Sequence, residues 1–229
     1  TEYLGNTLSE IASAKGGIIK PGCTVVCYES APEVTQTIAD ICAERGAGLT
    51  RSAAEDVTAV SASLDGQRFL WKGSEYIISL LGAHQLRNAA VALETIGQLR
   101  SRGWEISESA VREGLAATAW PARFEVLSRS PLFILDGGHN PQCAEAMAQN
   151  LRDYLPDQKV TFLMGVLADK DSDDMLRLLA PFAEQFVCVT PESPRALPAT
   201  KLCMRLRERG LSAQALDSIS DGIRAALQT

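Results

Sequence analysis

Hydrophobic and polar residues follow a strand–helix–strand order over the first part of the chain. Thr7 and Glu10 have the spacing of a capping box, which predicts a helix from this point to Lys15, where two glycines follow. The β-branched run at 23–28 lies between a Pro-Gly pair and a further proline, and it predicts a buried strand. Residues 32–45 place apolar side chains on one helical stripe, namely Val34, Ile38, Ile41 and Cys42. Strand, helix and strand in this order are typical of a parallel α/β sheet.

The pattern changes to the shorter period of β-strands between residues 50 and 80. Three runs rich in β-branched and aromatic side chains lie at 58–62, 68–71 and 76–81. An Asp-Gly pair at 65–66 separates the first two runs, and this dipeptide strongly favours a hairpin turn. We therefore expect an antiparallel flap beside the parallel sheet.

Two helices are predicted next. Residues 83–100 repeat apolar side chains at helical spacing, namely Leu86, Ala89, Ala90, Leu93 and Ile96. A second helix, 108–117, begins after Ser107, a favoured N-cap residue. A Trp-Pro pair then breaks the helix, so we place a domain boundary there, with domains at 1–118 and 119–229. A length of 229 residues suits two domains.

The second domain alternates short apolar runs with helical patterns. Strands are expected at 125–127, 132–135, 160–166, 186–189 and 213–216. Helices are expected at 141–155, 173–183, 199–209 and 218–227. This order predicts an α/β domain whose strands run mostly parallel.

Composition and charge narrow the classes of partner. The chain is 46% hydrophobic and 22% charged, as ordinary globular proteins are. Its formal net charge of −6 disfavours nucleic acid as the main partner, because phosphate backbones need a basic surface. There is no apolar run long enough to span a membrane, and the first residues do not resemble a signal peptide. The six cysteines form no CxxC pair, and we expect reduced thiols in a cytoplasmic protein.

The richest polar motif is the hexapeptide at 136–141. An apolar strand ends at Asp136, two glycines turn the chain, and Asn140 and Pro141 suit the start of a helix. Asp136 and His139 are thus expected at the carboxyl end of a strand beside a helix N-terminus, where open α/β sheets bind ligands and where anions are favoured. An ordinary strand–turn–helix connection, in which both side chains only satisfy the backbone, is the alternative.

Three further candidates are weaker when each is taken alone. His84, Gln85 and Asn88 begin a long helix, and an amide there can pair with an adenine edge or simply cap the helix. Lys15 lies in a last helical turn, where a lysine usually stabilises the helix dipole. Arg123 can clamp a phosphate at the domain junction or pair with the nearby Glu125.

The sequence also contains an acidic cluster, and it lacks two common catalytic motifs. Asp169, Lys170 and Asp171 follow an expected strand and could line the ligand crevice, whereas 172–174 read as a helix cap. The sequence contains no GxxxxGK[ST] loop to hold a triphosphate. No Cys/His or Ser/His pair suggests a covalent hydrolase, since His84 and His139 are the only histidines.

Taken in order, these motifs resemble those of the Mur ligase superfamily and, within it, the folylpolyglutamate synthases. The matching stretches are LGxT at 4–7, IAxxKxGIxK at 11–20, GxHQxxNAAxA at 82–92, P-G-R at 121–123, DGAHNP at 136–141 and GxxxDKD at 165–171. Three positions depart from the common pattern, namely Gly16, Ala122 and Gly138. The resemblance implies a P-loop-type ATPase domain without its P-loop over 1–118. It implies a Rossmann-like Mur ligase C-terminal domain over 119–229.

The resemblance also implies roles for individual residues. Lys15 resembles the lysine that reacts with CO2 to give a carbamate, a ligand near magnesium. Asn88, Arg123 and Asp136 resemble the ATP contacts, and His139 resembles the histidine near the γ-phosphate and the incoming glutamate. ATP and Mg²⁺ are the implied cofactors, and a folate and L-glutamate are the implied substrates. The folate carboxylate would attack ATP to give an acyl phosphate, which the amine of glutamate then displaces.

Length is the main departure from the family. Its members begin with a P-loop, and a metal-binding histidine precedes the LGxT motif; both would lie before Thr1. We therefore expect an N-terminally truncated form that is inactive alone, derived from an enzyme that is monomeric at full length. Two alternatives stay open: a peptidoglycan-precursor ligase of the same superfamily, and a non-catalytic binding module derived from a ligase.

Overall fold

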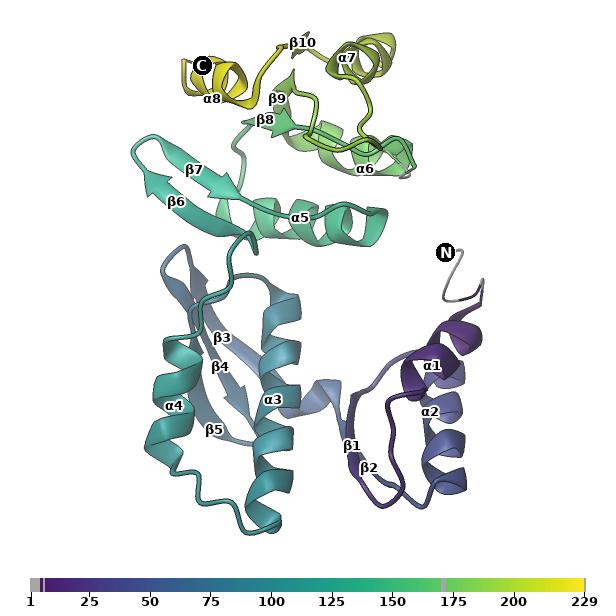
Figure 1. Cartoon of the computed structure of the whole chain (residues 1–229). Helices are drawn as coiled ribbons and strands as arrows, with labels where there is room; N and C mark the ends of the chain where they lie inside the picture. Colours follow the sequence, from purple (N-terminus) through teal and green to yellow (C-terminus); the bar gives the residue numbers. More distant parts are fainter. Residues whose placement is uncertain (1–4, 6, 170–171, 229) are drawn as a thin grey trace. The chain divides into compact units, whose positions relative to one another are not determined.

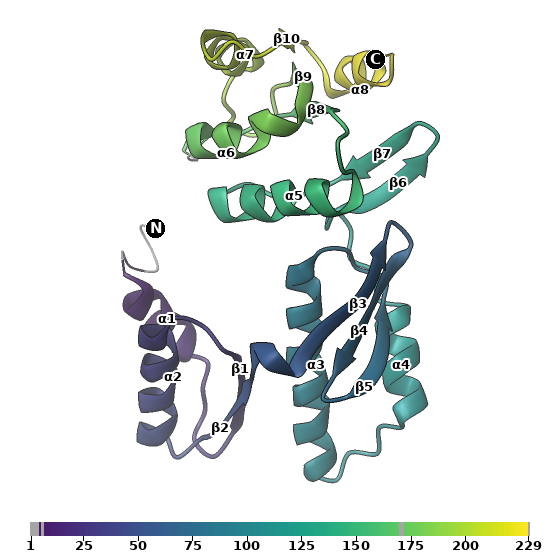
Figure 2. The same cartoon turned by 180° about the vertical axis from the view of Figure 1, so that it is seen from behind.

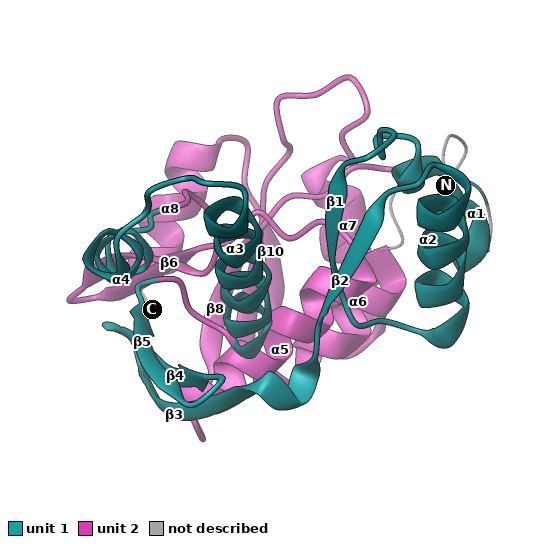
Figure 3. Ribbon diagram, turned by 90° about the horizontal axis from the view of Figure 1, so that it is seen from below, with its two compact units in different colours: residues 1–79, 83–119 teal, residues 80–82, 120–229 magenta. Residues whose placement is uncertain are grey.

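The computed structural model describes residues 5, 7–169 and 172–228, which form two compact units. The first unit comprises 1–79 and 83–119, and the second comprises 80–82 and 120–229 (Figure 3). Four residues of the sequence motifs lie outside the described residues, namely Leu4, Asn6, Lys170 and Asp171.

The first unit begins with two helices and a two-stranded parallel sheet. Its elements are α1 (Leu8–Gly16), β1 (Thr24–Tyr28), α2 (Pro32–Glu44) and β2 (Gly48–Ser52). The predicted capping box is confirmed: Glu10 N donates to Thr7 Oγ1 at 3.1 Å, and Thr7 N donates to Glu10 Oε2 at 3.1 Å. β1 and β2 pair in parallel, as the strand–helix–strand order predicts.

The predicted apolar stripe of α2 forms the core of this part. Ile38 and Cys42 are buried with Ala12 of α1 and with Ile19. Gly16 lets the two helices approach closely, because a Cβ at this position would lie 2.5 Å from Cδ1 of Ile41.

The expected antiparallel flap is confirmed as a separate sheet of three strands in the order β3-β4-β5. The strands are β3 (Val57–Ser63), which follows the 3-10 turn η1 (Ala54–Asp56), β4 (Gly66–Trp71) and β5 (Ser74–Ile78). Helices α3 (Ala83–Ser101) and α4 (Glu108–Ala116) lie over one face of this sheet (Figures 1 and 2). The third strand ends at Ile78 and not at the predicted residue 81, because 80–82 leave the sheet and belong to the second unit.

The second unit combines an antiparallel hairpin with a parallel sheet. Its strands are β6 (Glu125–Arg129), β7 (Leu132–Leu135), β8 (Val160–Met164), β9 (Ala183–Cys188) and β10 (Ala213–Ala215). Its helices are α5 (Pro141–Tyr154), α6 (Ser172–Leu179), α7 (Ala199–Glu208) and α8 (Ile219–Leu227), and η2 (Ala180–Phe182) is a 3-10 turn. The sheet β10-β9-β8 is parallel, as predicted, whereas β6 and β7 pair only with each other and antiparallel.

One predicted helix is wrong in its extent. The pattern favoured a helix over 173–183, but α6 ends at Leu179 and β9 begins at Ala183. Pro181 accounts for the difference, since it has no backbone N–H to continue an α-helix. A single 3-10 turn forms there instead.

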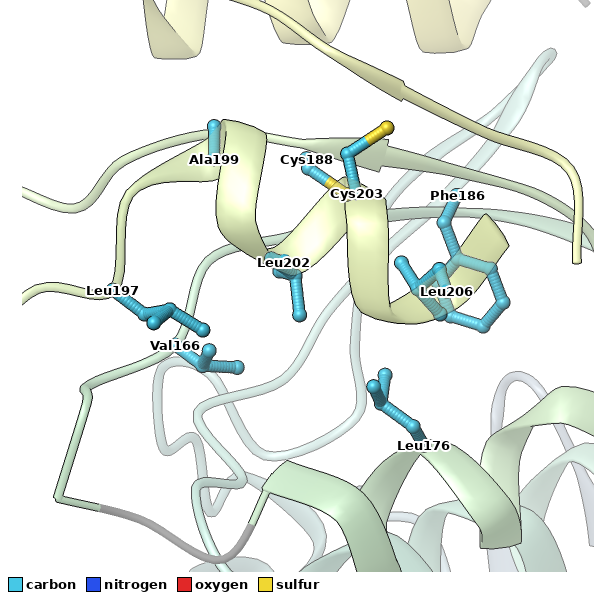
Figure 4. Packing of buried hydrophobic residues seen from close by; sticks show 9 residues of the cluster. All are labelled: Val166, Leu176, Phe186, Cys188, Leu197, Ala199, Leu202, Cys203 and Leu206. Carbon is cyan, nitrogen blue, oxygen red and sulfur yellow. The ribbon is translucent and has the colours of Figure 1, made fainter. Parts of the chain in front are cut away.

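Helices cover both faces of the parallel sheet. On one face, the side chains of α6 and α7 pack with Phe186 and Cys188 of β9 in the nine-residue cluster drawn in Figure 4. On the other face, Gly222 of α8 lies so close that a Cβ there would be 2.7 Å from Leu163 and from Val189. Strand side chains alternate between the two faces, which is why adjacent residues serve different helices. The predicted α/β fold is thus confirmed.

No helix among the described residues is both long enough and apolar enough to cross a membrane.

Candidate functional site

Asp136 holds two loops of the second unit together. It follows β7, is half-buried, and accepts hydrogen bonds with both carboxylate oxygens. Gly138 N donates to Oδ1 at 2.7 Å, and Phe124 N donates to Oδ2 at 2.8 Å. The carboxylate therefore joins the 136–141 turn to the loop that carries Arg123. As expected, Asp136 lies at the carboxyl end of a strand and shortly before a helix, but that strand belongs to the β6–β7 hairpin and not to the parallel sheet.

The loop at 121–125 has an unusual backbone. Ala122 and Phe124 have φ angles of 56° and 50°, so left-handed residues stand on both sides of Arg123. Ala122 N donates to Glu125 Oε2 at 2.8 Å, and Gly137 N donates to the Ala122 carbonyl at 2.9 Å. These two bonds fix the shape of the loop, one through the Glu125 side chain and the other through the 136–141 turn.

Arg123 itself is exposed and lies against the 136–141 turn. Its Nη1 is 3.8 Å from the point that a Cβ on Gly137 would occupy. No ion pair joins it to Glu125 among the described residues, because the Glu125 carboxylate accepts from the backbone of Ala122. Of the two alternatives for this arginine, the pair with Glu125 is wrong. The guanidinium is left facing solvent.

His139 and the start of α5 complete this group. His139 is exposed, and its Nδ1 lies 3.1 Å from the Gly137 carbonyl oxygen. In the tautomer with a proton on Nδ1 the ring donates to that carbonyl and leaves Nε2 free to accept. Asn140 caps the helix, since its Oδ1 accepts from Cys143 N at 2.8 Å, and Pro141 occupies the first turn as predicted. A helix N-terminus, an arginine and a histidine together favour an anion.

A pocket of about 100 Å³ lies beside the turn. Asp136, Gly138 and Cys143 are its polar rim. Its apolar walls come from α5, β8 and α6, namely Ala144, Met147, Phe162, Leu163, Met164, Met175 and Leu179. This volume equals roughly three water molecules, so the pocket suits a group the size of a side chain and not a nucleotide.

A larger depression of about 440 Å³ lies elsewhere in the same unit. It is lined by the α5–β8 connection and by η2, and Lys159 and Pro181 stand before the first residues of β8 and β9. This is the amino-terminal end of the parallel strands, whereas open α/β sheets bind ligands at the carboxyl ends. None of the residues singled out in the sequence lines it, so larger volume does not make it the better candidate.

The candidates in the first unit lie on different helices. His84, Gln85 and Asn88 are in the first turns of α3, and Asn88 Nδ2 donates to the buried Gln85 Oε1 at 3.0 Å. This bond orients both amides. Lys15 is exposed in the last turn of α1. No hydrogen bond or ion pair joins Lys15 to these three residues within the described part of the chain.

The acidic cluster has a structural partner. Asp169 Oδ2 pairs with Arg195 Nη1 at 3.0 Å on the surface of the second unit. The other two members, Lys170 and Asp171, lie outside the described residues. Among the residues that the structure describes, no group of three or more His, Cys, Asp or Glu side chains could hold a metal ion.

Two residues that help to shape the site are not marked as such by the sequence. The sequence indicates Glu125 only as an ion-pair partner of Arg123, yet its carboxylate is the acceptor that holds Ala122 N. Tyr154 accepts from Gly82 N at 2.9 Å, and its ring lies 5.7 Å from that of the buried Phe124. Both contacts lie within the second unit, to which Gly82, the first residue of the GxHQ motif, belongs. No local sequence signal marks either role, since both depend on contacts between distant residues.

The chain is similar in sequence to one family of ligases. Residues 122–229 match a family model described as "Mur ligase, glutamate ligase domain". The chain is 37% identical to a folylpolyglutamate synthase of Lacticaseibacillus casei in an alignment of 206 residues that covers 86% of this chain and 48% of that protein. It spans about half the length of the curated relatives it matches.

Solved structures agree with the sequence relatives. Mycobacterium tuberculosis folylpolyglutamate synthase complexed with ADP matches with a TM-score of 0.85 and 28% identity, over 100% of this chain and 53% of that one. A bifunctional folylpolyglutamate synthase/dihydrofolate synthase with Mn, AMPPNP and L-glutamate bound matches with a TM-score of 0.75 and 28% identity, again over 100% of this chain and 53% of that one.

Proposed function

Because residues 122–229 match the Mur ligase glutamate ligase domain family and the whole chain is similar to folylpolyglutamate synthases, we propose that this polypeptide serves an ATP-dependent ligase that adds L-glutamate to the γ-carboxylate of folates. The observation that carries the proposal is the Arg123–Asp136–His139 group at the start of α5. It offers positive charge and a hydrogen-bonding ring at one surface. The relatives bound to ADP and to AMPPNP with L-glutamate support the same substrates here.

The reaction needs an anionic intermediate to be held in place. The folate γ-carboxylate attacks the γ-phosphorus of ATP, ADP leaves, and an acyl phosphate forms. The amine of glutamate then adds to the acyl carbon, and the tetrahedral intermediate expels phosphate. Arg123 and the α5 N-terminus stabilise the negative oxygens, and His139 lies beside them to contact the phosphate or the incoming glutamate.

The domain roles follow the family resemblance. We assign residues 1–118 to the nucleotide-binding domain and 119–229 to the glutamate ligase domain. Asn88, with His84 and Gln85, is proposed to contact the adenine side of ATP. The hydrogen bond between Asn88 and Gln85 supports this role, because it holds the amide in a single orientation.

Asp136 is proposed to act on the nucleotide mainly through the loops it fixes. Each of its two oxygens already accepts a backbone N–H. Its remaining lone pairs can still meet a polar group of the nucleotide, since a carboxylate accepts about four hydrogen bonds.

Magnesium is the metal cofactor that the family resemblance implies. The donors of the described residues do not fit a metal ion by themselves, because they include no cluster of three His, Cys, Asp or Glu side chains. Lys15 as a carbamate would supply one anionic ligand, and its exposed position in α1 leaves it accessible to CO2.

Partners and location complete the proposal. A folate and L-glutamate are the substrates, and we propose a monomer. The six cysteines are all free, as in proteins of a reducing compartment, so we propose a cytoplasmic enzyme. The net charge of −6 argues against nucleic acid as a partner.

The proposal is tested with a chimera. The part of the Lacticaseibacillus casei enzyme that this chain does not match is joined to the 229 residues, and ADP release is measured with ATP, tetrahydrofolate and L-glutamate. We expect turnover by the chimera and none by the 229 residues alone, which have no triphosphate-binding loop. Replacing Arg123 with Ala should lower the chimera's kcat/KM by about a hundredfold, the effect of losing one charge-stabilising group.

Two outcomes oppose the proposal. Turnover with a UDP-linked peptidoglycan precursor but not with tetrahydrofolate would move the protein to the other Mur ligase branch. An inactive chimera that still binds ATP and glutamate tightly in calorimetry would indicate a binding module.

A further inference from the structure

Arg123 is displayed by a backbone that does not hold its shape alone. Ala122 and Phe124 both have left-handed φ angles, of 56° and 50°. Such angles are unfavourable for residues with a Cβ and persist only where surrounding contacts impose them. The loop therefore needs specific partners to keep Arg123 against Gly137.

Those partners are two carboxylates, one on β6 and one directly after β7. Glu125 is the first residue of β6 and lies opposite Leu135, the last residue of β7, so Glu125 and Asp136 stand at the same end of the hairpin. Asp136 restrains the far side of the loop by accepting from Phe124 N at 2.8 Å. Glu125 restrains the near side by accepting from Ala122 N at 2.8 Å.

The Glu125 bond also decides what Arg123 can do. A glutamate two residues after an arginine is well placed to neutralise it. Here Oε2 accepts from the Ala122 backbone, and among the described residues no ion pair joins Glu125 to Arg123. The guanidinium thus stays exposed while a negative charge supports the loop beneath it. Buried Phe124, only 1% exposed, anchors the other end.

We propose that Glu125 is a positioning residue, whose carboxylate holds the Ala122–Phe124 turn so that Arg123 is presented beside Gly137 and His139. It touches neither nucleotide nor glutamate and acts only through Arg123. The effect on catalysis rests on the proposed ligase function, whereas the effect on the loop does not.

The first experiment follows the loop itself in the 229-residue chain. Glu125→Met keeps the side-chain length but removes the acceptor, and Glu125→Gln keeps an acceptor oxygen. By amide hydrogen exchange, we expect exchange at Ala122 N to become about tenfold faster in E125M, the effect of one lost hydrogen bond, and to stay near the parent rate in E125Q. Glu145→Met, an exposed change on α5, should leave it unaltered. Unchanged exchange at Ala122 in a folded E125M would overturn the proposal.

The second experiment asks whether Glu125 acts through Arg123. In the chimera, E125M should lower kcat/KM by about tenfold, and E125Q should restore it. In the R123A background E125M should cause no further loss, because its only route to the substrate has been removed. A full additional loss in that background contradicts a positioning role.

Failure of this proposal stays distinct from failure of the ligase assignment. A parent chimera without ligase activity counts against the proposed function, and the exchange experiment then decides the role of Glu125 on its own. Should E125M fail to fold, the comparison is repeated in the A122G background, where the turn is less strained. In that background, equal rates of amide hydrogen exchange at residue 122 in E125M and E125Q would overturn the proposal.

Discussion

Ala122 adopts a φ of 56°, a backbone conformation that costs a residue with a Cβ roughly 1–2 kcal/mol. The sequence shows that alanine stands where the family pattern has glycine, but it does not show the φ angle that makes the difference matter. The structure supplies the physical reason: glycine adopts this angle without a steric penalty.

Replacing Ala122 with Gly should therefore stabilise the second unit. We expect a gain of about 1 kcal/mol, seen as a higher urea midpoint with an unchanged slope. Ala146→Gly, within the regular helix α5, is the matched control and should destabilise by about the same amount. A midpoint for A122G that falls like that of the control would contradict the left-handed turn.

Burial of the Cys188 thiol predicts how stability changes with pH. Burial, aided by the neighbouring Cys203, raises the pKa of its thiol from 9.0 to about 12. The thiol therefore stays neutral in the folded state while the unfolded thiol ionises near its ordinary pKa. Its contribution to stability is complete below pH 9.0 and is lost as the pH rises toward about 12.

The raised pKa also predicts low reactivity. With iodoacetamide at pH 8, folded protein should be modified at the half-buried Cys143 well before Cys188, because the thiolate is the nucleophile. Peptide mass spectrometry reads both sites. Equal labelling of the two residues in folded protein would show that Cys188 is not buried as described.

At the scale of elements, signals at helix starts proved the most informative. Thr7, Ser107 and Asn140 each accept from the backbone N–H that capping predicts. Helix ends were less certain, since Pro181 ends α6 in a way that apolar spacing did not reveal. Capping depends on a few adjacent residues, whereas a helix end also depends on what the chain packs against.

The cap of α5 can be tested directly. Asn140→Ala removes the acceptor for Cys143 N and should cost about 1 kcal/mol of stability, measured by urea denaturation. Asn140→Asp keeps an acceptor oxygen and should stay close to the parent. If the two variants were equally destabilised, the loss would not come from the cap.

At the scale of the whole molecule, the order of strands and helices could be predicted from periodicity and turn residues. Which strands pair could not. The sequence suggested that β7 belongs to a mostly parallel sheet, but it pairs antiparallel with β6. Pairing depends on contacts between residues far apart in the chain, and local patterns carry no record of them.

Only some residues of the candidate site could be identified from the sequence. Arg123, Asp136 and His139 were identified from their motifs, and the structure brings them together around Gly137. Glu125 and Tyr154 were not identified, because their roles are hydrogen bonds to the backbone of other segments. Sequence motifs identify the side chains that perform chemistry more readily than they identify the side chains that hold a loop in shape.

We propose that this polypeptide serves a folate–glutamate ligase, and the mass of the folate product is the decisive measurement of that activity. Tetrahydrofolate is incubated with the chimera, ATP, Mg²⁺ and L-glutamate, and the folates are then separated and weighed by mass spectrometry. We expect folates lengthened by glutamyl residues that a γ-glutamyl hydrolase removes, and much less of them with R123A. Unmodified tetrahydrofolate, under conditions in which the Lacticaseibacillus casei enzyme extends it, would show that this polypeptide does not serve such a ligase.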